Sequence, residues 1–80
     1  MLSINVCYFA LLREKVGLDQ EVVETMAKTY GELFEDLSRK YHFGLPSSMI
    51  QLAVNDEFAQ MGEQIESGAK VVFIPPVAGG

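Results

Sequence analysis

Apolar and polar side chains alternate along residues 2–9, which read LSINVCYF. A period of two is expected of a strand that turns one face toward a core, so this stretch predicts the first β-strand. Three further strands are predicted in QEVVETMA at 20–27, in MIQLAVN at 49–55 and in KVVFI at 70–74.

Turn-forming residues divide the second half of the chain. Asn55 and Asp56 tolerate left-handed backbone and predict a turn, after which Phe58 and Ala59 can start a short return strand. Pro75 should end the last strand, because proline lacks the N–H that a central ladder needs.

Two segments predict helices. Residues 10–17, ALLREKVG, are mostly good helix formers closed by a glycine, which favours one or two turns. A longer helix is expected from about 30 to 42. Thr29 can cap it while Glu32, three residues on, reaches back to the N–H of the cap, as in a capping box.

The longer helix is amphipathic. Its charged side chains lie largely elsewhere, and one apolar stripe is formed by Leu33, Phe34, Leu37 and Tyr41. We expect Gly44 to end this helix and Pro46 to prevent its resumption. The stripe needs a sheet to cover.

The order strand, strand, helix, strand, short strand, strand leaves room for one layer of sheet and one helical layer. The predicted fold is therefore α+β, a ubiquitin-like β-grasp with a mixed sheet of four to five strands covered on one face by one main helix. Residues 1–74 form this domain, and residues 75–80 an extended C-terminal tail ending in Gly-Gly.

Composition and charge limit the classes of function that the chain can have. Eighty residues make one small domain, with 49% hydrophobic and 21% charged residues, as in ordinary globular chains. The net charge is −5 and the basic residues are scattered, so a nucleic-acid partner is not expected, and most acidic side chains, Glu21 among them, should simply solvate the surface. No stretch is apolar for long enough to span a membrane and no signal peptide opens the chain, which predicts a cytoplasmic protein.

The predicted sheet carries more apolar surface than one helix can cover. The helix-facing positions are Ile4, Val6, Tyr8, Val71 and Phe73. Alternation then sends Cys7, Phe9, Val72 and Ile74 to the open face, where Phe58 and Val77 could join them. Such a cluster is either a binding patch or ordinary crowding in a tiny protein.

Candidate catalytic side chains are few. Cys7 is the only cysteine and His42 the only histidine, so neither a disulfide nor a metal cluster can be built. Cys7 suits packing better than nucleophilic attack, and His42 suits the end of a helix better than acid–base chemistry. Arg13 and Glu14 could form a surface ion pair or orient the loop beside the tail for a partner. No glycine-rich loop can cradle phosphates, so any ATP chemistry must belong to another protein.

Three segments together resemble a known family. They are FALLREKVG at 9–17, LAVN at 52–55 and SGAKVVFIPPVAGG at 67–80. They are similar to the small, sulfur-carrying subunit of molybdopterin synthase, a ubiquitin-like family whose members end in Gly-Gly. The resemblance covers nearly the whole chain.

The resemblance implies that Gly80 is the reactive residue. An E1-like adenylyltransferase would adenylate its carboxylate with ATP, and a sulfurtransferase donor would supply sulfur for conversion to a thiocarboxylate. Two such sulfurs would pass in turn to cyclic pyranopterin monophosphate, inside the large subunit of a synthase with two copies of each subunit. This chain would bind no cofactor or metal and would not be catalytic alone.

The resemblance also implies which residues meet the partners. Phe9, Phe58 and Ile74 match family positions of the apolar contact, although Ile74 stands where an aromatic residue is familiar. The full expected set of partner-binding residues is Phe9, Arg13, Phe58, Ile74, Pro75, Pro76, Val77, Ala78 and Gly79.

Three alternatives stay open at this point. A sulfur carrier of the thiamin type would share the fold, the terminus and the activation. A ubiquitin-like modifier would join Gly80 to lysine side chains. A simple binding module would use the apolar face and leave the tail idle.

Overall fold

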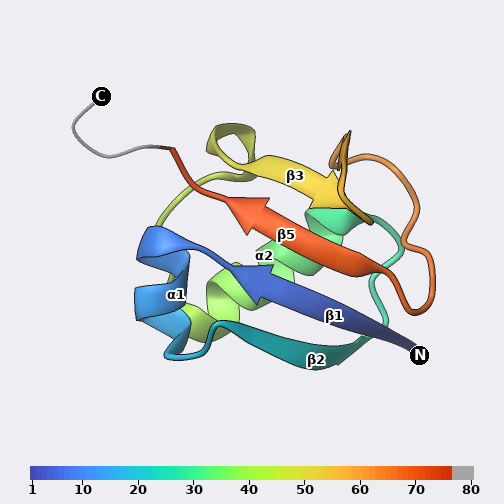
Figure 1. The fold of residues 1–80 in the computed structure, drawn as a ribbon, viewed down its shortest axis with the longest axis horizontal. Helices are drawn as coiled ribbons and strands as arrows, with labels where there is room; N and C mark the ends of the chain where they lie inside the picture. The colour runs from blue at the N-terminus through green and yellow to red at the C-terminus, as the bar shows by residue number, and fades with distance from the viewer. Residues whose placement is uncertain (77–80) are drawn as a thin grey trace.

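The computed structural model describes residues 1–76. Five strands form one mixed sheet in the order β2-β1-β5-β3-β4 (Figure 1). The central strands β1 and β5 are parallel, and the other neighbours pair antiparallel. The strands are β1 Leu2–Tyr8, β2 Gln20–Thr25, β3 Gln51–Val54, β4 Glu57–Ala59 and β5 Lys70–Ile74.

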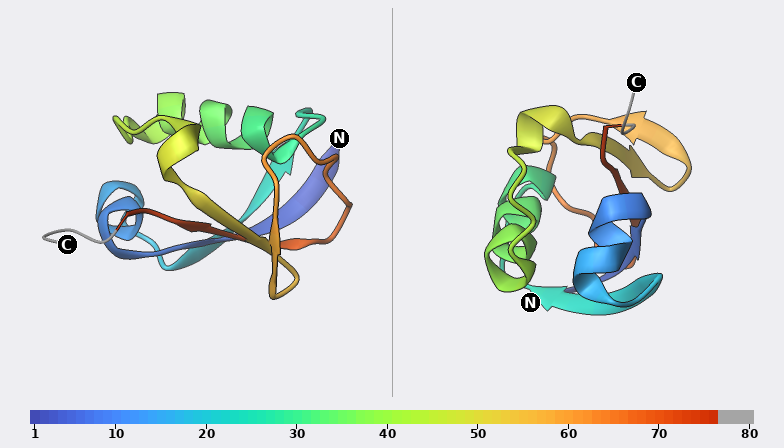
Figure 2. Two further views of the ribbon diagram at one scale, coloured as in Figure 1. Left: turned by 90° about the horizontal axis from the view of Figure 1, so that it is seen from above. Right: turned by 90° about the vertical axis from the view of Figure 1, so that its left-hand side faces the viewer.

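The main helix α2, Tyr30–Tyr41, covers one face of the sheet and leaves the other open (Figure 2). A shorter helix α1, Ala10–Val16, lies at the end of the sheet where β1 and β5 finish (Figure 1). A 3₁₀ turn, η1 Ser47–Met49, leads into β3. None of the described helices is long and apolar enough to cross a lipid bilayer. The predicted β-grasp architecture is confirmed.

The side chains that the alternation predicts to face the helix are buried. Ile4 and Val6 of β1 and Val71 and Phe73 of β5 are fully buried beneath α2. Phe34 of α2 meets Phe73 edge to face, with ring centroids 5.2 Å apart. Each such side chain contributes about 1.5 to 3 kcal/mol by leaving water, so this face fixes the register of the sheet.

The start of α2 follows the predicted capping box. The Glu32 N–H donates to Thr29 Oγ1 at 3.2 Å, and the Thr29 N–H donates to the Glu32 carboxylate at 3.4 Å. The end of the helix differs from the prediction. His42, with φ 57°, makes the left-handed turn, two residues before Gly44. The earlier turn carries Phe43 into the core, where it is 2% exposed, so burial overrides the glycine preference.

Three strand boundaries also differ, and β2 ends at Thr25 rather than at Ala27. The first strand ends at Tyr8, and Phe9 becomes the N-cap of α1. The third begins at Gln51, because Met49 belongs to the 3₁₀ turn after Pro46. Apolar residues at these ends continue the strand-like pattern past the residues that pair in the sheet, so the predicted strands were too long.

Candidate functional site

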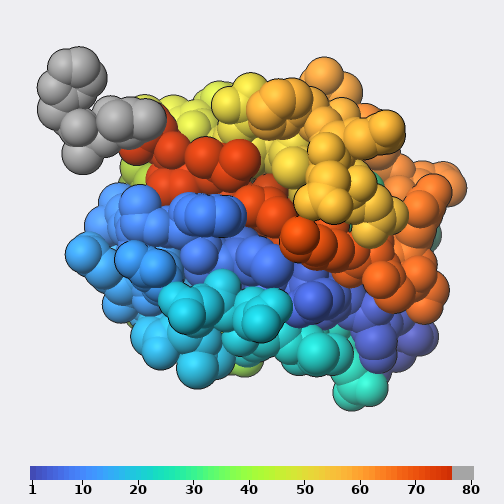
Figure 3. All heavy atoms as spheres, viewed as in Figure 1, coloured from blue at the N-terminus to red at the C-terminus, as the bar shows by residue number. Residues whose placement is uncertain are grey.

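The open face of the sheet carries a row of apolar side chains. The register places Cys7 beside Val72, Val72 beside Ala53, and Ala53 beside Phe58, across four neighbouring strands. The first three side chains are half-buried, whereas Phe58 is 74% exposed. Figure 3 shows this face of the molecule, on which β1 and β5 lie next to each other.

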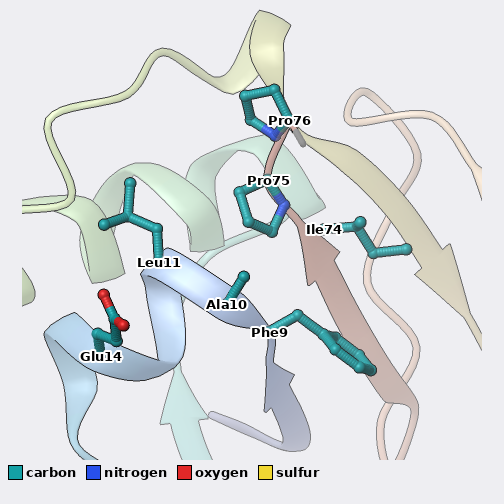
Figure 4. A pocket seen from close by; sticks show the side chains of 7 residues that line it. All are labelled: Phe9, Ala10, Leu11, Glu14, Ile74, Pro75 and Pro76. Atoms are coloured by element: carbon teal, nitrogen blue, oxygen red, sulfur yellow. The ribbon is translucent and has the colours of Figure 1, made fainter. Parts of the chain in front are cut away.

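A second apolar pair lies at the end of the sheet nearest the tail. Phe9, just beyond β1, is 51% exposed, and Ile74 ends β5 half-buried. Both side chains project to the same side (Figure 4). The sheet patch is defined as Cys7, Phe9, Ala53, Phe58, Val72 and Ile74. The described residues among those predicted for the open face lie there, whereas Val77 lies outside the described residues, and Ala53 was missed. Contiguous apolar side chains at a surface mark binding sites.

A hollow of about 600 Å³ adjoins the sheet patch, between α1 and the end of β5. The lining that the described residues form is apolar except for one carboxylate (Figure 4). The α1 groove is lined by Phe9, Ala10, Leu11, Glu14, Ile74, Pro75 and Pro76. Pro75 is buried and Pro76 exposed, so the chain leaves the domain at the rim of this groove.

The groove owes its shape to how α1 begins. The Phe9 carbonyl accepts the Leu12 N–H at 3.0 Å, and Ala10 has a left-handed φ of 48°, which reverses the chain directly after β1. Leu12 is fully buried and anchors the helix. Leu11 and Glu14, three residues apart, therefore share the outer face that lines the groove.

Arg13 pairs with Asp19, so the surface ion pair that was one of two possibilities for Arg13 and Glu14 is not formed. The Arg13 Nη1 and Asp19 Oδ1 atoms are 3.5 Å apart, and both side chains are exposed. Such a pair contributes little to stability. Arg13 does not line the groove, and Glu14 forms no ion pair with any residue of the described part of the chain.

Neither of the other residues considered for catalysis, Cys7 and His42, lines the α1 groove. Cys7 is a half-buried member of the sheet patch, with Sγ 3.9 Å from Gln20 Oε1. His42 is exposed at the end of α2. Residues 1–76 contain no group of three or more side chains placed to hold a metal ion. The described domain thus offers surfaces for contact rather than a catalytic constellation.

A polar cluster on the helix side was not predicted. The hydroxyls of Tyr8 and Tyr41 both donate to Glu21 Oε2, at 2.6 and 2.8 Å. Burial, followed by the bond to this carboxylate, raises the pKa of both tyrosines. Glu21 therefore ties β1, β2 and α2 together instead of only solvating the surface.

The structure describes only part of the C-terminal tail predicted to bind partners. Val77, Ala78, Gly79 and Gly80 lie outside the described residues, so the roles expected for them stay predictions. Pro75 and Pro76, the first residues after β5, are described and line the α1 groove.

Comparison with known proteins gives full-length matches. The model of the ThiS family matches residues 6–80. The molybdopterin synthase sulfur carrier subunit of Mycobacterium tuberculosis is 36% identical, with all of both chains covered. The crystal structure of small archaeal modifier protein 1 from Haloferax volcanii is 26% identical and superposes with a TM-score of 0.78, covering 98% of this chain and 99% of that one.

A further structural neighbour comes from Helicobacter pylori. It is a protein–protein complex of subunits 1 and 2 of the molybdopterin-converting factor, with a TM-score of 0.65, 20% identity, and coverage of 99% of this chain and 100% of that one. The neighbours share the β-grasp fold, and the relatives share the sequence over its whole length. The chain therefore belongs to the ThiS family and, within it, to the molybdopterin synthase sulfur carrier subunits.

Proposed function

We propose that this chain carries sulfur for molybdopterin synthase as a thiocarboxylate on Gly80. The observation that carries the proposal is the 36% identity to a sulfur carrier subunit in a match that covers the whole of this chain, which itself ends in two glycines. A carrier needs a reactive end and a surface by which other proteins hold it. The sheet patch and the α1 groove offer that surface, next to the point where the tail begins.

Activation requires a second protein. A carboxylate is a poor electrophile, so an E1-like adenylyltransferase would join the Gly80 carboxylate to AMP from ATP and release pyrophosphate. A persulfide on the sulfurtransferase donor would then attack the acyl carbon and release AMP, and a thiol would reduce the resulting acyl disulfide, which frees the donor and leaves the thiocarboxylate on Gly80. The chain itself would bind neither ATP nor metal, and its sole modification would be the new carbon–sulfur bond at Gly80.

Transfer uses the sulfur as a nucleophile. An ionised thiocarboxylate attacks in the same manner as a cysteine thiolate. On cyclic pyranopterin monophosphate, held by the large subunit, the sulfur would form a carbon–sulfur bond in place of a carbon–oxygen bond. Water would then cleave the bond between this sulfur and the Gly80 carbonyl carbon, so that the carrier leaves as a carboxylate, and a second charged carrier would repeat the transfer to complete the dithiolene. Gly79 and Gly80 lack a Cβ, which lets the backbone enter a narrow channel. Pro75 and Pro76 restrict the chain and lower its ordering entropy.

The large subunit would hold the sheet patch. Apolar side chains at the centre of such a contact contribute most of the binding free energy, and aromatic residues such as Phe9 and Phe58 are typical of it. The Helicobacter pylori neighbour, solved as a complex of its two subunits, supports a partner of this kind. Proton transfers and substrate binding would come from the large subunit, so catalysis would be shared.

Single-turnover reconstitution tests the proposal. Charged carrier, the large subunit and cyclic pyranopterin monophosphate are mixed without the activating enzyme, and the dithiolene product is measured by mass spectrometry. We expect one product for every two carriers, because each carrier holds one sulfur. A chain ending at Ala78 is the control and should give none. Equal product from the truncated chain would contradict the proposal.

A second candidate is a protein modifier, favoured by the likeness to small archaeal modifier protein 1. In that case Gly80 would form isopeptide bonds with lysine side chains. Peptides bearing the C-terminal residues on lysine, in digests of cell extract, would support the modifier.

Complex formation with a thiazole-forming enzyme and none with the large synthase subunit would instead favour a thiamin-type carrier.

A further inference from the structure

We infer that the α1 groove receives a segment of the large synthase subunit in which an apolar side chain is followed closely by a lysine or arginine that faces Glu14. This inference rests on the proposed function. It adds a second contact to the sheet patch and gives that contact a charge requirement.

The apolar part of the inference comes from the shape and lining of the groove. A hollow of about 600 Å³ falls within the range of sites that enclose several side-chain groups. Leu11 is 41% exposed here, although its neighbour Leu12 is fully buried, so α1 presents one leucine to the core and one to the groove. Pro75 lies opposite α1 (Figure 4). An aliphatic or aromatic side chain would cover surface that the domain leaves in water.

The charged part comes from Glu14. Among residues 1–76, it is the one ionisable side chain that lines the groove. The basic residues that form ion pairs in the described chain bond elsewhere, Arg13 to Asp19, Arg39 to Asp36 and Lys70 to Asp56. A carboxylate beside apolar surface binds a cation more strongly once a partner excludes water, because the local dielectric falls. A guanidinium or ammonium group suits that position.

The position of the groove selects the occupant. It ends at Pro76, and four residues follow to Gly80, which span at most about 14 Å when fully extended. A protein that brings reactive groups to Gly80 must therefore lie close to this rim. The groove also shares Phe9 and Ile74 with the sheet patch, so one partner can cover both.

A second copy of this chain is a poorer occupant. Each copy has a net charge of −5 and would bring its own acidic surface toward Glu14. A contact between two α1 grooves would also bring the Glu14 carboxylates of the two copies together, and like charges repel, whereas a partner segment with a cation satisfies Glu14. The inference therefore commits to the large subunit.

Affinity measurements with paired variants test the inference. The dissociation constant for the purified large subunit is measured by calorimetry at low and high salt. We expect Glu14→Lys to weaken binding by about tenfold or more and Glu14→Gln by about threefold, with both effects smaller at high salt. Glu35→Lys, at an exposed glutamate of α2, is the control and should stay within about twofold.

The apolar contact has its own matched pair. Leu11→Ser should weaken binding by about tenfold with little dependence on salt. Leu18→Ser removes a leucine that is 49% exposed but does not line the groove, and should change binding by less than about twofold. Circular dichroism and thermal unfolding of each variant separate loss of contact from loss of fold.

The outcomes separate the two claims. Binding that neither Glu14→Lys nor Leu11→Ser weakens, while Phe58→Asp in the sheet patch does, would overturn the inference while the proposed function stands. Loss with Leu11→Ser but not with Glu14→Lys would overturn the cationic occupant. A wild-type chain that does not bind the large subunit at all would overturn both claims.

Discussion

At the residue scale, one carboxylate oxygen holds three elements together. Glu21 Oε2 accepts hydrogen bonds from Tyr8 of β1 and Tyr41 of α2, while Glu21 itself belongs to β2. Tyr8 is 3% exposed, so its hydroxyl would lack a partner without this acid. Hydrogen bonds to a charged group of this kind contribute about 1.5 to 3 kcal/mol each.

This cluster predicts a loss of stability in alkali. Burial raises the folded pKa of Tyr8 above the ordinary 10.0, first by desolvation and then through Glu21. A raised folded pKa means that the stabilisation is complete below pH 10 and is lost as the pH climbs above 10 toward the folded pKa. Urea unfolding of the wild type between pH 8 and pH 11, values set by the reference pKa of about 10, should show this fall.

Tyr8→Phe gives the matched comparison. It should lower the free energy of unfolding by about 1 to 2 kcal/mol at pH 8, since Glu21 keeps its bond from Tyr41. Its stability should then fall less steeply above pH 10 than that of the wild type. Parallel pH profiles for the two proteins would mean that Tyr8 does not cause the alkaline loss.

At the scale of elements, the sequence predicts what side-chain period alone controls. Alternation in β1 and β5 predicted the strands and their buried face, because burial on one side fixes the register. The apolar stripe predicted α2. The capping box at Thr29 could also be predicted, because it involves only residues that are close together in the sequence. The left-handed turn at His42 was not predictable, since it depends on where Phe43 reaches the core.

The site divides in the same way. The sheet patch could be predicted because it is the other half of the same alternation, and Ala53 was missed because its small side chain gives little signal. The α1 groove could not be predicted, because it forms only when α1 lies against residues at the far end of the chain. Likewise, Glu21 is thirteen residues from Tyr8 and twenty from Tyr41, so no local pattern joins them.

The sheet face carries a prediction at this scale. Phe9→Asp and Phe58→Asp should each weaken binding of the large subunit by about thirtyfold or more, as expected for central aromatic contacts. Both side chains are at least half exposed, so the melting temperature should change little. Met26→Asp, at a 76% exposed methionine outside the patch, is the control and should bind normally.

Surface plasmon resonance with immobilised large subunit measures these affinities, and calorimetric melting measures the fold. If the Phe9 and Phe58 variants unfold, these residues belong to the core. If they fold and bind as tightly as Met26→Asp, the sheet patch is not the contact surface.

At the scale of the whole molecule, the domain acts as a handle for its last residue. The sheet patch, the α1 groove and the start of the tail meet at one end of the sheet, so a single partner can grip the domain while the tail reaches its active site. The core and α2 lie on the other side and fix this geometry. The central claim is therefore that Gly80, and not a side chain of the domain, bears the sulfur.

Intact-protein mass spectrometry tests that claim most directly. The full chain is incubated with ATP, an E1-like activating enzyme known to be competent on another carrier, and a sulfur source. We predict a mass increase equal to one oxygen replaced by sulfur, with tandem fragmentation placing the change on Gly80 and no change in a chain ending at Ala78. An unchanged mass, or sulfur found on Cys7 instead, would contradict the account.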